Sequence, residues 1–338
     1  MKEKIISKQL FVLMFLSAFS FVSTLSSDAL GDNIWDSILS VFIAFGLNIA
    51  LSIPIFLLFK KENTVPEKIA ESIYFKPLAL FYLLFFVLSN SIEITQLENL
   101  FINTIFPDAP PIILASLLLL ASVYGAIKGV EAVARASYFV FVFALIGLVL
   151  IVLGSFYLID IDKREVFFYN GTDDMLWNTV VIFSRISTLP QLAILIFCVK
   201  DKAKITGFFT SQICVATACA LIFVILVLCM GRFASTQIYP IYTLFTVAKL
   251  KPLERLDSIF SFVWLMIFTL KLSVSFVAIK IFFDKKAVYI SAVIMLFLST
   301  SFVGISVLPT SYIQLFLIIP SLILGFFVPL YYLRKGKK

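Results

Sequence analysis

The sequence contains no histidine. This absence excludes catalytic triads and proton relays built on imidazole, and it excludes zinc sites that need a histidine ligand. Cysteine is also scarce: the four cysteines lie in or beside apolar runs at spacings that match no metal motif, which is typical of buried packing thiols. The sequence also lacks a cofactor-binding loop, a nucleophile paired with a base and an extramembrane domain. We therefore do not expect an enzyme, a metal or a cofactor.

Charged residues make up only 14% of the 338 residues, whereas soluble domains carry about 25%. Hydrophobic residues make up 61%, and they gather in ten runs close to the 20 or so residues that cross a bilayer as a helix. The ten runs are Leu10–Leu25, Ile34–Phe59, Pro77–Ile94, Pro111–Ala126, Ala132–Ile159, Met175–Val199, Ile205–Met230, Ile259–Phe283, Ala287–Val307 and Tyr312–Leu333. The sequence thus predicts an all-α integral membrane protein of ten transmembrane helices, with residues 1–338 forming one polytopic domain in the lipid bilayer.

The positions of the basic residues predict how this bundle is oriented, because cytoplasmic connections are rich in lysine and arginine. With the N-terminus placed inside, 19 of the 27 basic residues fall on inner segments, six fall on outer segments, and Arg185 and Lys271 fall within spans. Both termini are therefore predicted to be cytoplasmic. The net charge of +7 follows from membrane topology rather than from a nucleic-acid partner. The first run follows three lysines, as in a signal peptide, but no small-residue cleavage site follows it, and we expect a retained helix.

Ten spans suggest two inverted repeats of five helices, at about residues 8–159 and about residues 174–334. In transporters built this way, the ligand lies where corresponding helices of the two halves are broken. The sixth span is interrupted by Phe183–Gln191, in which Pro190 removes a backbone hydrogen bond and favours a kink or unwinding. Its counterpart, the first span, is equally rich in hydroxyl groups. The candidate ligand-binding residues are Ser20, Ser23, Thr24, Ser184, Arg185, Ser187, Thr188 and Gln191, with Lys271 from the eighth span. The plainer alternative is a kinked packing helix whose arginine extends toward the interface.

Arg185 and Lys271 are the two basic residues well inside spans, and a central charge costs about 2.5–3.5 kcal/mol on insertion scales. Each is therefore expected to face a cavity or a partner. Glu93, near the predicted outer end of the third span, is the nearest candidate counter-charge for Lys271. The pair either fixes the packing, which gives Glu93 a structural or coupling role, or one cation meets the carboxylate of a small ligand. No aspartate or glutamate is expected deep in a span, which disfavours a proton or sodium relay built on carboxylates.

Several short stretches carry a family resemblance. They are Phe106–Pro110 before the fourth span, Gly129–Ser137 at the start of the fifth, Glu254–Phe260 with Trp264 and Lys271–Ser273 in the eighth, and Gly31 and Trp35 after the first. Together they resemble the spore germination permease family, the B subunits of GerA-type germinant receptors. The length and the ten-helix topology match this family along the whole chain. The sequence departs from it at Ala18 and Ser20, where glycines are expected in the first-helix break, and at Gln191, which replaces an acidic residue.

The resemblance implies the LeuT-like fold of the amino acid-polyamine-organocation superfamily, with helices one and six broken around the ligand. It also implies a place in the inner membrane of the endospore, beside an A subunit and a lipoprotein C subunit, and the sensing of a small germinant, commonly an amino acid. Glu131 and Arg135, at the cytoplasmic turn of the fifth helix, are expected to hold helix positions rather than to touch ligand.

Our first hypothesis is thus a transporter-like subunit of a germinant receptor that binds a small molecule at the break between helices one and six. Two alternatives stand beside it. One is an amino acid permease that moves its substrate across the membrane. The other is an ion-conducting channel or scaffold subunit whose polar residues line a pore.

Overall fold

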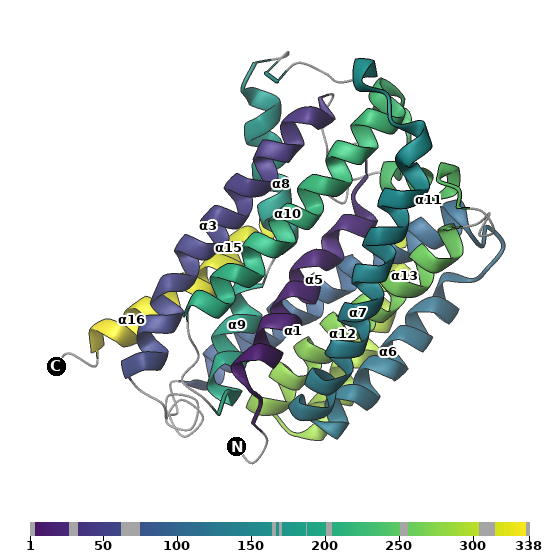
Figure 1. Cartoon of the computed structure of the whole chain (residues 1–338). Coiled ribbons are helices and arrows are strands. Elements are labelled where there is room, and N and C mark those ends of the chain that lie inside the picture. Colours follow the sequence, from purple (N-terminus) through teal and green to yellow (C-terminus); the bar gives the residue numbers. More distant parts are fainter. Residues whose placement is uncertain are drawn as a thin grey trace.

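The computed structural model is a bundle of helices, and it describes residues 4–26, 33–61, 75–163, 167–168, 171–186, 188–200, 205–250, 256–303 and 315–335. Over these residues, nine helices are long and apolar enough to cross a membrane, and a shorter apolar helix, Ile318–Arg334, follows them. The predicted all-α membrane fold is therefore confirmed, with nine or ten apolar spans where ten were predicted. The first helix begins and the last helix ends on the same side of the bundle (Figure 1).

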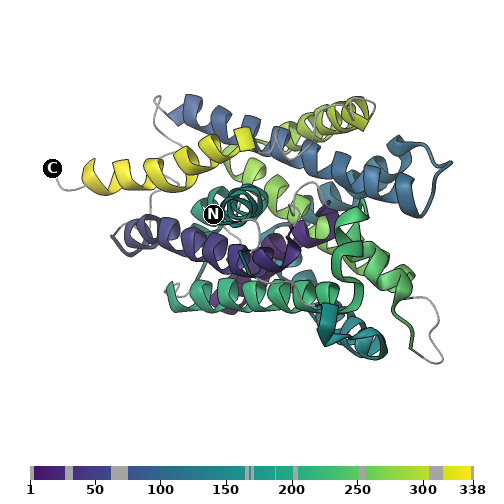
Figure 2. The same cartoon turned by 90° about the horizontal axis from the view of Figure 1, so that it is seen from above.

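The α-helices form one packed body and follow one another along the chain in this order. They are α1 (Ser7–Phe19), α3 (Ile34–Lys61), α5 (Phe75–Thr104), α6 (Pro111–Lys128), α7 (Val130–Ser155), α8 (Asp173–Ile186), α9 (Leu189–Leu195), α10 (Ile205–Met230), α11 (Pro240–Val247), α12 (Asp257–Phe282), α13 (Lys285–Val303), α15 (Ile318–Leu322) and α16 (Val328–Lys335). Short 3-10 helices are η1 (Ser20–Thr24), η2 (Phe156–Leu158), η3 (Ile161–Lys163), η4 (Ile196–Cys198) and η5 (Gly231–Thr236), while η6 (Ile323–Phe327) is a π-helix. Helix α3 lies beside α10 (Figure 2), and α12 packs on α6 and α7.

The side chains are distributed as a lipid environment requires. Large apolar residues such as Leu120, Phe139 and Phe297 are 68%, 73% and 71% exposed on the outside of the bundle. Many serine, asparagine and glutamine side chains lie buried between the helices, together with the charged side chains of Asp36, Glu93, Glu98, Arg185, Asp257 and Lys271. Polar groups are expensive in hydrocarbon and therefore face the bundle interior, where they find partners.

The first and sixth spans are both interrupted, as predicted. Helix α1 gives way at Ser20 to the tighter turns of η1, which end at Thr24. Helix α8 ends at Ile186, and α9 restarts at Leu189 with Pro190 in its first turn. Proline suits that place because the first amide groups of a helix have no intrahelical acceptor. The two breaks put non-helical backbone in the middle of the bundle.

One expectation about the third span is wrong. Helix α5 runs unbroken over 30 residues from Phe75 to Thr104, past the predicted end at Ile94. Glu93 and Glu98 are therefore inside the span, and they are only 6% and 0% exposed. The polar run that suggested a helix end instead faces the protein interior, so acidic residues do lie deep within the bundle.

The segment before α1 is joined to the end of the sixth span. The backbone N–H of Ile5 donates to the Cys198 carbonyl at 2.8 Å, and the N–H of Lys200 donates to the Ile5 carbonyl at 2.8 Å. These two bonds form a parallel bridge between Ile5 and Val199. They connect the beginning of the first span to the end of the sixth by backbone alone.

The π-helical turn of the last span packs against the sixth-helix break. A π-helical turn has hydrogen bonds between residues five apart in place of the α-helical bonds between residues four apart. The buried Tyr82 hydroxyl donates a hydrogen bond to the carbonyl of Leu324 in this turn at 2.8 Å. Next to it, Gly325 lies directly against Leu189, the first residue of α9. Helix α5 and the last span thus support the break from one side.

Candidate functional site

The hydroxyl groups of η1 are used first to stabilise its own turns. Ser20 donates to the Ser17 carbonyl at 2.9 Å, and Ser23 donates to the Ser20 carbonyl at 3.2 Å. The Thr24 hydroxyl donates to the Phe21 carbonyl at 3.4 Å. Each bond goes back three residues, which favours local turns over a continuing α-helix. A serine-rich sequence therefore provides the break that glycine provides elsewhere.

Lys271 of α12 lies at the start of this break. Its ammonium group is 2.7 Å from Oε1 of Glu93 and donates to the Ser20 hydroxyl oxygen at 2.9 Å. The side chains of Lys271 and Glu93 are 3% and 8% exposed, so the pair is almost fully shielded from solvent. This is the ion pair expected from the sequence, and it links helices α12 and α5 to η1.

Arg185 lies at the other end of the same break. Near the C-terminus of α8, its Nη1 donates to the Thr24 carbonyl at 2.9 Å, and the residue is only 2% exposed. Thr24 is the last residue of η1, whose carbonyl groups have no helical partner. The arginine therefore caps η1, and the two buried cations hold its two ends.

These groups surround a small cavity of about 10 Å³ at the meeting point of the broken helices. It is lined by Ser20, Phe21, Thr24, Glu93, Gln96, Arg185, Phe268 and Lys271. A cavity of about 10–15 Å³ holds one water molecule, so a larger ligand enters this space only when the side chains around it move apart. Two cations and one carboxylate give the lining one net positive charge, which is best balanced by an anionic group.

The remaining predicted residues lie near the cavity but bond elsewhere. Ser23 bonds within η1, and Ser184 donates to the Val181 carbonyl at 2.6 Å. Ser187 lies outside the described residues, as do Gly31, Glu254 and Arg255 of the family-like stretches. The part of Ser23, Ser184 and Ser187 in ligand binding stays a prediction.

Thr188 and Gln191 belong to two amide networks around the sixth-helix break. Asn48 of α3 donates to the Thr188 hydroxyl at 3.0 Å and to Oε1 of Gln212 at 2.8 Å. Gln191 donates to the Ser275 hydroxyl at 3.0 Å, and Ser275 donates to Oδ1 of Asn90 at 3.3 Å. The sequence analysis missed Asn48 and Gln212, although a single amide in an otherwise apolar span is a signal for such a network.

Glu131 and Arg135 form an exposed ion pair within one helix. They form a 2.6 Å salt bridge one turn apart within α7, with side chains 44% and 73% exposed. Exposed pairs of this kind contribute little to stability. The bridge joins two turns of one helix, and the wider role in holding helix positions stays a prediction.

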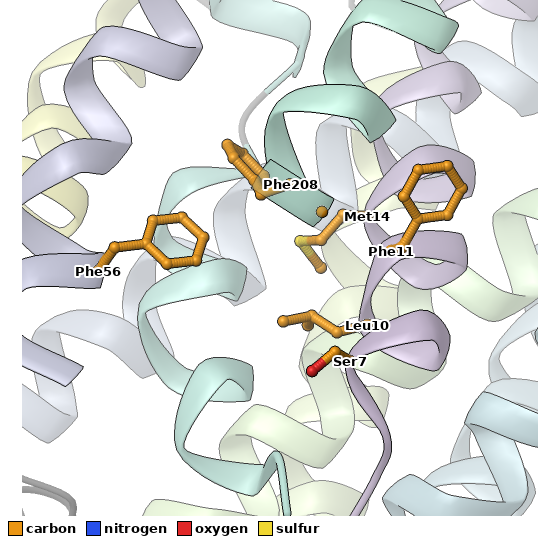
Figure 3. Close-up of a pocket in the computed structure, with 7 residues that line it drawn as sticks. Ser7, Leu10, Phe11, Met14, Phe56 and Phe208 are labelled. Atoms are coloured by element: carbon orange, nitrogen blue, oxygen red, sulfur yellow. The ribbon is translucent and has the colours of Figure 1, made fainter. Parts of the chain in front are cut away.

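A second small cavity, of about 10 Å³, lies between α1, α3 and α10 (Figure 3). Figure 3 shows the rings of Phe11, Phe56 and Phe208 with Leu10 and Met14 around it, and Ser7 is the polar side chain there. No charged residue lines this space, so it offers nothing to a charged ligand. Within the described ranges, no group of three or more cysteine, aspartate or glutamate residues is placed to hold a metal ion.

The fold resembles that of a known transporter. A solved structure of a Na⁺-coupled sialic acid symporter, in its substrate-bound outward-open state, aligns with a TM-score of 0.60. The alignment covers 96% of this chain and 79% of that chain at 13% sequence identity, which shows a shared LeuT-like fold. No curated protein sequence matches the chain significantly. The model of the spore germination protein family, however, matches residues 4–312, and the chain therefore belongs to that family.

Proposed function

We propose that this membrane protein is a subunit of a spore germinant receptor that binds a small carboxylate-bearing germinant, an amino acid above all, in the cavity between η1 and α8. The observation that carries the proposal is the pair of buried cations on that cavity. Arg185 and Lys271 lie at the two ends of a broken helix in a space with net positive charge. Buried ionisable groups in a membrane bundle mark ligand pathways more often than they mark simple packing.

Arg185 is the residue best suited to hold the carboxylate. A guanidinium group offers five donors in a planar fork that matches a carboxylate. A carboxylate is a stronger acceptor for it than the neutral Thr24 carbonyl, because charge-assisted hydrogen bonds are about twice as strong as neutral ones. A bound germinant would compete for the arginine that caps η1.

This competition also supplies a way to signal. When Arg185 turns to the ligand, the last turn of η1 loses its cap, and the segment after Thr24 is free to take another position. Ligand occupancy is thereby converted into movement of the first helix relative to α8. In the spore we place this protein in the inner membrane beside the A and C subunits, which receive that movement and trigger germination.

A second candidate function is an amino acid permease. It is favoured by the likeness of the whole chain to a symporter fold, since a break that binds a ligand serves transport equally well. Net uptake into vesicles separates the two functions, because a sensor needs binding alone.

The proposal is tested in spores that lack the native copy and carry either the wild type or Arg185→Gln at equal abundance. Germination rate is recorded against concentration for each amino acid. Losing a charge-assisted hydrogen bond of about 1.5–3 kcal/mol raises the half-saturating concentration of the active amino acid by about 10-fold or more. Arg135→Gln removes an exposed arginine and serves as the matched control. Unchanged dose curves for Arg185→Gln would refute the site.

A further inference from the structure

Only one of the two carboxylate oxygens of Glu93 has a bonding partner in the described part of the chain. Its Oε1 meets the ammonium of Lys271 at 2.7 Å, while the buried Oε2 has no hydrogen-bond partner among the described residues. A carboxylate accepts about four hydrogen bonds through its two oxygens. The Ser20 hydroxyl beside it gives its proton to the Ser17 carbonyl, so its oxygen faces Lys271 as an acceptor. Glu93 and Ser20 together present acceptors to a group that has several N–H donors.

A primary ammonium group fits this arrangement. It carries a positive charge that the buried carboxylate needs, and three N–H donors that the carboxylate and the hydroxyl accept. Lys271 satisfies these needs with an ammonium on a flexible, unbranched chain. The same cavity contains Arg185, which suits a carboxylate. Ammonium and carboxylate positions are thus found in one small cavity, and the ammonium position is filled by the protein itself.

We propose that Glu93 and Ser20 form a binding site for a primary ammonium group, which Lys271 fills in this conformation and from which the ligand's own ammonium displaces it. This inference rests on the proposed function, which identifies the cavity as the ligand site. It adds the ammonium site as a second recognition element and Lys271 as the group that competes for it. Displacement leaves the total charge of the cavity unchanged when the ligand is a zwitterion. The displaced ammonium of Lys271 stays near enough to neutralise the ligand's carboxylate together with Arg185.

The competition has a structural consequence. Lys271 belongs to α12, and Ser20 is the first residue of η1, so their hydrogen bond ties the eighth span to the break in the first. Displacing Lys271 removes that tie at the same time as the ligand draws Arg185 away from Thr24. Both ends of η1 are then released by one binding event. Molecules that lack an ammonium release only one end.

The test uses the full-length protein in detergent and an amine that replaces the missing side chain. Lys271→Ala removes three methylene groups and the ammonium, and n-propylammonium restores the same atoms. We expect millimolar n-propylammonium to raise the thermal unfolding midpoint of Lys271→Ala by about 2 °C or more. Uncharged 1-propanol and sodium chloride, each at the same concentration as the amine, should leave the midpoint unchanged. The wild type, whose site is filled, should not respond to the amine.

The double variant Lys271→Ala/Glu93→Gln decides whether the carboxylate is responsible, since it should lose the response to the amine. If Lys271→Ala does not fold, Lys271→Ser, which leaves nearly the same space for the amine, gives the same comparison. An equal response in the double variant, or no response in the folded single variant, overturns the ammonium site. Either result leaves the dependence of germination on Arg185 intact, whereas a failure of the proposed function removes that dependence as well.

Discussion

The contact between Gly325 and the sixth-helix break leads to a quantitative prediction. A Cβ atom added at Gly325 would lie 2.5 Å from Cβ of Leu189 and 3.3 Å from its carbonyl carbon. Non-bonded carbon atoms prefer about 3.5–4.0 Å, so the two segments must separate by about 1 Å. Neither atom is at the end of a flexible side chain, and the movement therefore falls on the backbone of η6 and α9. Overpacking of this kind costs about 1–3 kcal/mol.

The matched control is Gly46→Ala, a change on α3 whose added Cβ meets nothing within 4 Å. In a helix, replacing glycine with alanine otherwise stabilises by about 0.5–1 kcal/mol. We expect Gly46→Ala to unfold slightly later than the wild type and Gly325→Ala to unfold clearly earlier, in thermal unfolding of the purified protein. The difference between the two variants isolates the clash with Leu189. Equal midpoints would refute the close packing of the last span on the break.

Three further substitutions follow from single interactions. Tyr82→Phe removes the donor to the Leu324 carbonyl in the π-helical turn and should lower stability by about 1–3 kcal/mol in the same unfolding assay. Asn48→Leu breaks a buried network that includes Thr188, and it should lower the unfolding midpoint more than Asn103→Leu, an exposed asparagine on α5. Arg135→Gln should change the free energy of unfolding by less than about 0.5 kcal/mol, because its salt bridge is exposed. A larger loss would mean that the pair does hold helix positions.

Nine of the ten predicted spans, and the two breaks, could be predicted from the sequence. Length, hydropathy and Pro190 are local signals, and membrane insertion leaves few other ways to satisfy the backbone. The length of α5 could not be predicted by the same means. Hydropathy falls wherever polar residues gather, whether the helix ends there or turns those residues inward, and Glu93 and Glu98 are a case of the second kind.

The site could be predicted only in part. The pairing of Lys271 with Glu93 follows from the cost of an isolated charge in a span, and the structure contains it. Which hydroxyls reach the cavity depends on the helical phase inside a broken segment, where the regular period of 3.6 residues no longer holds. Ser20 and Thr24 line the cavity, while Ser23 between them bonds along η1.

The backbone bridge between Ile5 and the end of the sixth span limits which parts of the two broken helices can separate. The half of the first span before its break and the half of the sixth span after its break cannot move apart at the bridge unless two backbone hydrogen bonds break together. They are expected to move as one rigid lever, with the fulcrum at the central breaks. Such a movement leaves the Ile5 bridge unchanged, and it links a displacement of η1 to the end of the bundle where the bridge lies.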